Sequence, residues 1–250
     1  MKIRKLSAFV FLLLVVTSSG QTNRNSRRTV ATQAGILAKQ QNALGNRVSA
    51  AGKEQTIYIG EVFHADGQRA PAQVVHQQPA LVRLEGFSPG RALTFDGERT
   101  AGIITKTDEA AVEVFTADLP EGLFASLQNG AALRHLGNAF GPDPRGMPNY
   151  SELRYDIFST SGRRLTGGNS GLQSKLYYFD SETGLLQVTR YADESVPPRT
   201  QRETRFGSWR VIDGSAFPGR VEHHQDGRLL FSFTANLITS NRATEAGRFR

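Results

Sequence analysis

The stretch Leu229–Thr239 reads LLFSFTANLIT. Apolar side chains alternate in it with polar ones: Phe231, Phe233, Ala235 and Leu237 fall between Ser232, Thr234 and Asn236. Successive side chains of a β-strand point to opposite faces of its sheet, so the pattern predicts a strand with one apolar and one polar face. Strands of this kind belong to antiparallel sheets that are covered on one side.

Short β-rich runs separated by turn signals extend this pattern over most of the chain. The runs expected to form strands are 56–63, 72–75, 80–85, 93–95, 100–106, 176–179, 185–191, 200–211, 217–224 and 229–239. Asp-Gly occurs four times, beginning at Asp66, Asp96, Asp213 and Asp226. This dipeptide suits two-residue hairpins because both central residues need positive φ. The runs and turns therefore predict an antiparallel meander in place of parallel βαβ units.

Two segments have the periodicity of amphipathic helices. Residues 29–51 carry apolar side chains at steps of three and four, with Gln41 the only polar residue in that register. Residues 119–136 follow Asp118, a suitable N-cap, and have proline and glutamate at the positions typical of a first helical turn. Gly137 can end this second helix. Each helix presents an apolar stripe that predicts packing against the sheet.

The first twenty residues have the three parts of a signal peptide. A basic start precedes Leu6–Val16, an uncharged run of eleven residues, and small residues follow up to Gly20. A membrane span needs about 20 apolar residues, so this run is too short to be an anchor. We therefore expect cleavage after Gly20, and no membrane span in the mature chain.

The composition limits what the exported chain can be. Cysteine is absent, so no disulfide can form and no lipid can be attached to a cysteine near the cleavage site. The net charge of +7 includes three cations of the signal peptide, and the other arginines form no dense basic stripe of the kind that binds nucleic acid. We expect a disordered segment at 21–28, a single domain at 29–250, and a periplasmic or secreted location.

Three phrases carry a resemblance to a known family: Tyr177–Leu186 (YYFDSETGLL), Val211–Val221 (VIDGSAFPGRV) and Ile238–Phe249 (ITSNRATEAGRF). In this order they resemble the LolA-like outer-membrane lipoprotein-sorting proteins and periplasmic carriers. The resemblance implies a mainly β (α+β) fold, in which a curved, incomplete antiparallel β-barrel has helices covering its concave face. It also implies an apolar cavity for lipid or lipoprotein acyl chains, and hence a binding protein that needs no cofactor.

Five apolar side chains are the candidates for lining such a cavity. Three lie on the second expected helix and two on the last strand: Leu123, Phe124, Leu127, Phe231 and Phe233. The same aromatic side chains could instead fill an ordinary core, since buried aromatics more often do so. In that case the chain would be an interaction module for other envelope proteins.

A serine hydrolase is a further alternative. Gly168–Gly171 (GNSG) places Ser170 in a glycine-rich loop, and His64 with Asp96 or Asp108 precedes it in the chain order of trypsin-like proteases. However, the flanking residues lack the second glycine expected in that loop, and Ser170 is not in a G-x-S-x-G elbow. We therefore expect no catalytic residue.

A metal site is also disfavoured by the sequence. His223 and His224 stand beside Glu222 and Asp226, but adjacent residues of a strand point to opposite faces, so the two rings would not converge on one ion. The other histidines lack the helical i, i+4 spacing of paired ligands. We expect solvent-facing histidines near a hairpin and no bound metal.

Overall fold

A computed structural model of the chain describes residues 34–35, 37–45, 54–77, 81–96, 100–102, 105–128, 130–141, 153–163, 172–193 and 200–242. The chain divides into two units, Met1–Lys39 and Gln40–Arg250, and the described strands all belong to the second. The expected signal peptide and the segment 21–28 lie outside the described residues. Within the described residues, no helix is both long and apolar enough to cross a membrane.

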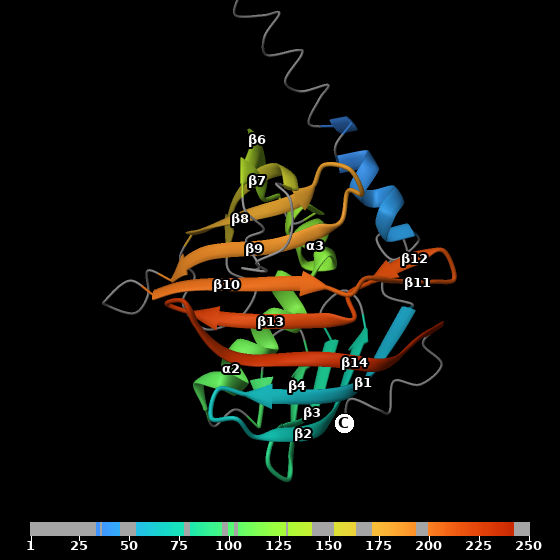
Figure 1. The fold of residues 1–250 in the computed structure, drawn as a ribbon, viewed down its shortest axis with the longest axis vertical. Helices are drawn as coiled ribbons and strands as arrows, with labels where there is room; N and C mark the ends of the chain where they lie inside the picture. The colour runs from blue at the N-terminus through green and yellow to red at the C-terminus, as the bar shows by residue number, and fades with distance from the viewer. Residues whose placement is uncertain are drawn as a thin grey trace, which may run out of the picture. The chain divides into compact units, whose positions relative to one another are not determined.

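Twelve strands form one antiparallel sheet in the second unit, in the order β5-β4-β3-β2-β1-β14-β13-β10-β9-β8-β7-β6 (Figure 1). These strands are β1 (Glu54–His64), β2 (Arg69–Gln77), β3 (Leu81–Ser88), β4 (Arg91–Asp96), β5 (Thr100–Ala101), β6 (Ala132–Gly141), β7 (Leu153–Arg163), β8 (Leu172–Asp180), β9 (Leu186–Asp193), β10 (Thr200–Gly207), β13 (Arg220–Gln225) and β14 (Arg228–Arg242). β11 (Arg210–Ile212) and β12 (Ser215–Phe217) pair with each other in a separate two-stranded sheet. Among the described strands, β5 and β6 are the two edge strands and do not pair with each other, so the sheet does not close. The expected incomplete, curved barrel is confirmed.

The Asp-Gly turns differ from one another. Asp213 and Asp226 have φ of 50° and 49° and the glycines that follow them 77° each, so both residues of these two turns have the positive φ that we expected. At Asp66 only the following Gly67 has positive φ, and the amide of His64 donates to the carbonyl of Gln68 across a longer turn. The turn expected at Asp96 extends beyond the described residues.

Three helical segments follow β5 and lie on one face of the sheet: α2 (Lys106–Glu113), the π-helix η2 (Val114–Asp118) and α3 (Pro120–Gln128) (Figure 1). The expected strand 100–106 is wrong beyond Ala101. The Thr105 hydroxyl accepts from the amide of Asp108, whose carboxylate accepts from the Thr105 amide, and this capping box starts a helix at Lys106.

The second expected helix, 119–136, is also shorter than predicted. It is α3, which ends at Gln128, and β6 begins at Ala132 and continues through Gly137. The apolar residues of 132–136 belong to an edge strand that pairs with β7, so their periodicity does not reflect a helix. Asp118 does not cap α3, because its carboxylate bonds to Lys175 and Thr204 of the sheet.

The first expected helix is present where the structure describes it, at 34–35 and 37–44. In the second unit, Gln40 and Leu44 are buried, four residues apart. Gln41, which the pattern placed on the buried face, is exposed. The buried face therefore includes Gln40 and not the polar residue that we expected.

The alternation along β14 holds only as far as Ala235. Phe231, Phe233 and Ala235 are buried, whereas Leu237 is 51% exposed. The register between β1 and β14 shifts between Ile59 and Gly60, so one residue of β14 has no partner and the faces exchange beyond it. This bulge is the physical reason that Leu237 lies on the outer face.

Candidate functional site

Phe231 and Phe233, two of the five expected lining residues, lie in a buried aromatic cluster. With Phe87 of β3 and Phe115 of η2 they form edge-to-face and tilted pairs. The ring centroid of Phe87 lies 5.6 Å from that of Phe231 and 5.9 Å from that of Phe233. The cluster packs the helical segment against β3 and β14, and its spacing is that of favourable aromatic pairs in a core.

The other three expected residues lie on α3. Leu123 and Phe124 are buried, and Leu127 is half-buried near the end of the helix. That these five side chains enclose one ligand cavity stays a prediction.

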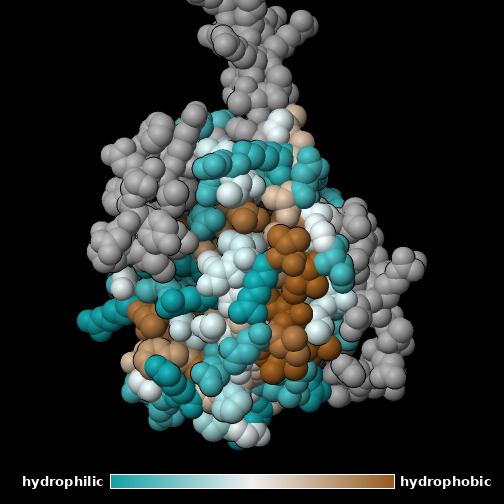
Figure 2. All heavy atoms as spheres, turned by 45° about the vertical axis from the view of Figure 1, so that its right-hand side comes forward, coloured by the Kyte–Doolittle hydropathy of each residue, from teal (hydrophilic) through white to brown (hydrophobic). Residues whose placement is uncertain are grey.

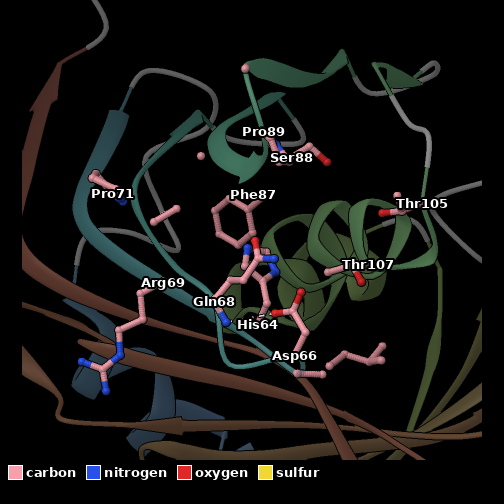
Figure 3. Close-up of a pocket in the computed structure, with 15 residues that line it drawn as sticks. His64, Asp66, Gln68, Arg69, Pro71, Phe87, Ser88, Pro89, Thr105 and Thr107 are labelled. Atoms are coloured by element: carbon pink, nitrogen blue, oxygen red, sulfur yellow. Dashed lines mark hydrogen bonds between the residues drawn. The ribbon is translucent and has the colours of Figure 1, made fainter.

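A pocket of about 740 Å³ opens beside the aromatic cluster (Figure 3). Three segments of the chain form most of its walls: the turn between β1 and β2, the turn between β3 and β4, and the start of α2. Its lining is mixed, with hydroxyl, amide and imidazole groups next to apolar side chains. The residues are His64, Ala65, Asp66, Gln68, Arg69, Ala70, Pro71, Gly86, Phe87, Ser88, Pro89, Gly90, Thr105, Thr107 and Leu230.

Phe87 reaches both the pocket and the cluster because of a bulge in β3. The pairing of β3 with β4 shifts between Glu85 and Ser88, which gives β3 extra residues at this point. Gly86 has φ of 83°, and a Cβ on it would lie 2.0 Å from the carbonyl oxygen of Pro71, so only glycine fits there. Phe87 lines the pocket, and its ring also packs against those of Phe231 and Phe233, so this residue connects the pocket to the aromatic cluster.

Polar groups hold the wall of the pocket that α2 provides. The Ser88 hydroxyl donates to the buried carboxylate of Asp108 over 2.5 Å, which ties the β3–β4 turn to the first turn of α2. Arg69 is directed away from the other lining residues in Figure 3 and lies over the ring of Phe63, 5.5 Å from its centroid. The α2 side of the pocket therefore presents the hydroxyl-bearing residues Thr105 and Thr107, next to Ser88 of the β3–β4 turn.

Only the histidine and the aspartates of the hydrolase alternative lie in the described part of the chain. Ser170 lies outside the described residues. His64 lines the pocket, and Asp96 is the last residue of β4. The Asp108 carboxylate accepts from Ser88 and from the Thr105 amide. Asp108 thus supports the start of a helix.

A buried network of charged groups joins the helical segment to the sheet, away from the pocket lining. Lys175 Nζ lies 2.6 Å from Asp118 Oδ1 and 3.8 Å from Glu113 Oε1. Arg202 Nη1 donates to Glu113 Oε2 over 2.9 Å, and the Thr204 hydroxyl donates to Asp118 Oδ2 over 2.5 Å. Two carboxylates thus balance two cations. Burial raises the pKa of Asp118, an effect that Lys175 opposes.

His223 borders this network and is fully buried, so the expectation of two solvent-facing histidines is wrong for this one. Its Nδ1 lies 2.9 Å from Thr204 Oγ1. Burial and the nearby cations Arg202 and Lys175 lower its pKa to about 3, against an opposing effect of Glu113. His224 is half-buried and lies 3.5 Å from Glu222, on the other face of β13, so the expected divergence of the two rings is confirmed.

Sequence reasoning missed both Phe87 and the charged network. The phrase LEGFSPG at 84–90 holds a glycine inside a strand pattern, which is a signal for a bulge that re-aims the next side chain. Local spacing predicts a helix cap at Asp118, because it does not show partners that lie far along the chain. Lys175 and Thr204 are 57 and 86 residues away.

No family model matches the chain, and no curated protein matches it by sequence. Among solved structures, a candidate outer membrane lipoprotein-sorting protein domain from Vibrio parahaemolyticus is 9% identical, with a TM-score of 0.56 over 86% of this chain and 95% of that one. A DUF1329 family protein from Desulfovibrio piger is 9% identical, with a TM-score of 0.50 over 86% and 99%. A LolA superfamily protein from Nitrosomonas europaea is 12% identical, with a TM-score of 0.47 over 86% and 97%. At such identities the likeness concerns the fold, and it confirms the resemblance in fold that the three phrases indicated.

Proposed function

We propose that the chain is an exported, non-enzymatic binding protein for an apolar ligand, such as a lipid or the acyl chains of a lipoprotein, in the bacterial envelope. The observation that carries the proposal is the pocket of about 740 Å³ that Phe87 helps to line. Pockets for small ligands have volumes of roughly 300–1,000 Å³ and combine an apolar lining with a few polar groups. The structures that share this fold, by their names, include a lipoprotein-sorting domain, which supports the same class of ligand.

The ligand's apolar part would enter past Phe87 toward Phe231 and Phe233. Each methylene group buried there contributes about 0.8 kcal/mol, so an acyl chain needs no charged contact to bind usefully. In this proposal Leu123, Phe124 and Leu127 form the deeper wall, which becomes accessible when α3 moves. Ser88 and Thr105 would face the more polar end of the ligand at the mouth of the pocket.

Displacement of a fluorescent fatty-acid probe from the purified chain tests the proposal. Ala70→Phe enlarges a lining side chain of β2 and should weaken probe binding, whereas Ala101→Phe on the exposed end of β5 is the matched control and should not. Leu127→Trp enlarges a half-buried side chain of α3 and tests the deeper wall. Equal probe uptake by all three variants and the parent would contradict a site at this pocket.

An interaction module with a filled core is the second candidate. Its supporting observation is an exposed apolar pair on the outer face of the sheet. Ile59 and Leu237 are cross-strand partners of β1 and β14 and are 45% and 51% exposed. Figure 2 shows an apolar strip on the surface of the molecule. Protein that takes up no probe and binds an envelope protein through Ile59 and Leu237 would favour this candidate.

A further inference from the structure

The strongest unexplained feature outside the pocket is the contact between Lys175 of β8 and Asp118 of η2. The amine and carboxylate are 2.6 Å apart, and their side chains are 10% and 0% exposed. A second carboxylate, from Glu113, lies 3.8 Å from the same amine. A buried network of four charged groups is often less stabilising than well-packed apolar side chains of the same volume. Stability alone is therefore a weak explanation for the network.

We propose that Lys175 and Asp118 join in an intramolecular isopeptide bond, with Glu113 as the proton carrier. The bond would tie η2 covalently to β8. It would give this cysteine-free chain a cross-link of the kind that other exported proteins obtain from disulfides. This inference does not depend on the proposed ligand.

The π-helical turn places the two carboxylates for this reaction. Glu113 and Asp118 are five residues apart, and the i→i+5 geometry of η2 brings both of them to the same amine. Such turns are rare and occur frequently at functional sites. The backbone carbonyl of Asp118 also accepts from the Thr189 hydroxyl over 3.4 Å, and the Lys175 amine lies 4.3 Å from the centroid of the Tyr191 ring. The reacting groups are therefore held on several sides, which favours reaction.

The reaction begins with a proton transfer within the ion pair. The two carboxylates raise the pKa of Lys175 against the effect of its burial, so the resting amine is charged. Burial raises the pKa of Asp118, which helps its carboxylate to accept that proton. The neutral pair that results is the reactive state, because only an uncharged amine has a lone pair to attack a carbonyl.

The bonds that form and the bonds that break balance without any co-reactant. The lone pair of Lys175 Nζ attacks Asp118 Cγ, while the Thr204 hydroxyl polarises the carbonyl through Oδ2. Glu113 takes one proton from the attacking nitrogen and returns it to Oδ1. The Cγ–Oδ1 bond then breaks and Oδ1 leaves as water, with Oδ2 as the amide oxygen. Nothing is oxidised or reduced, and the Glu113–Arg202 ion pair remains.

Mass spectrometry of the denatured, purified chain tests the proposal. We expect a mass lower than that of the sequence by one water molecule. Asp-Gly sequences can also lose water, so a tryptic digest decides where the loss occurred. In the cross-linked chain, the peptide 107–134 is joined to 165–190, which trypsin leaves uncut at Lys175. Linear peptides that end at Lys175 in the wild-type digest would overturn the proposal.

Two variants separate the covalent bond from the ion pair. Lys175→Arg retains the positive charge but cannot form the amide, so its digest should contain the linear peptide 107–134. Glu113→Gln keeps the shape of the proton carrier and should leave Lys175 unbonded in folded protein. A joined peptide in Glu113→Gln would refute the role given to Glu113. If this variant does not fold, the wild-type digest still decides whether the bond exists.

Discussion

The burial of His223 predicts a pH-dependent stability whose size follows from its pKa. The Thr204 hydroxyl donates its one hydrogen to Asp118, so His223 carries its own hydrogen on Nδ1 and donates to Thr204. Its Nε2 is buried without a partner, and protonation there would bury a charge. The pKa is therefore about 3 in the folded chain, against 6.5 when the ring is exposed.

A lowered pKa means that the unfolded chain binds the proton more readily. The stabilisation is fully present above pH 6.5 and is lost as the pH falls toward 3. At pH 5 the loss is about 2 kcal/mol, and the full difference in pKa corresponds to about 5 kcal/mol. This is a large fraction of the stability of an ordinary domain.

Urea unfolding at pH 7, 5 and 4, followed by circular dichroism, measures this effect. His223→Asn retains a donor toward Thr204 but cannot be protonated. Subtracting the variant's free energy of unfolding from that of the wild type removes the background of the carboxylates that titrate in both. We expect this difference to fall by about 2 kcal/mol between pH 7 and pH 5. A difference that stays constant over this range would refute the buried, neutral state of His223.

Three further outcomes follow from other parts of the chain. Gly86→Ala should lower the free energy of unfolding by about 2 kcal/mol or more, because the cost of positive φ adds to that of a blocked Cβ. Gly67→Ala has positive φ but open space around the Cβ, so it should lower the free energy of unfolding by about 1 kcal/mol. Equal losses in denaturant melts would contradict this difference. N-terminal sequencing of envelope-fractionated protein should begin after Gly20, and an intact start on membrane-embedded protein would disprove export by cleavage. The chain should take up no serine-directed fluorophosphonate label; a label that Ser170→Ala abolishes would restore the hydrolase alternative.

The sheet could be predicted from the sequence because its signals are local. Alternation and turn dipeptides identified the hairpin of β8 and β9 and the strands β10, β13 and β14, and the turns at Asp213 and Asp226 have the predicted backbone. The expected strand 200–211 is wrong beyond Gly207, because its last residues belong to the separate hairpin of β11 and β12. The N-terminal half was harder, since α2 depends on a capping box at Thr105 inside a run that has strand-like composition. The pattern of β14 predicts the wrong face for Leu237, because a bulge in the pairing with β1 leaves no mark in that pattern.

The candidate sites could be predicted less well than the fold. The apolar residues of α3 and β14 follow from periodicity, and Phe231 and Phe233 are indeed inward-facing. The pocket instead depends on Phe87, which a β-bulge directs inward. The charged network depends on contacts of α2 and η2 with β8 and β10, which only the folded sheet brings together. Neither arrangement has a signature within one segment.

The central claim, that this chain binds an apolar ligand, is tested most directly by native mass spectrometry with lipid extraction. Protein purified under mild conditions from the envelope should carry an extractable lipid or acyl-chain ligand, and the fluorescent fatty-acid probe should displace it. Ala70→Phe should reduce the bound fraction, and Ala101→Phe should leave it unchanged. A chain that emerges at its ligand-free mass, yields no lipid and takes up no probe would contradict the proposed function.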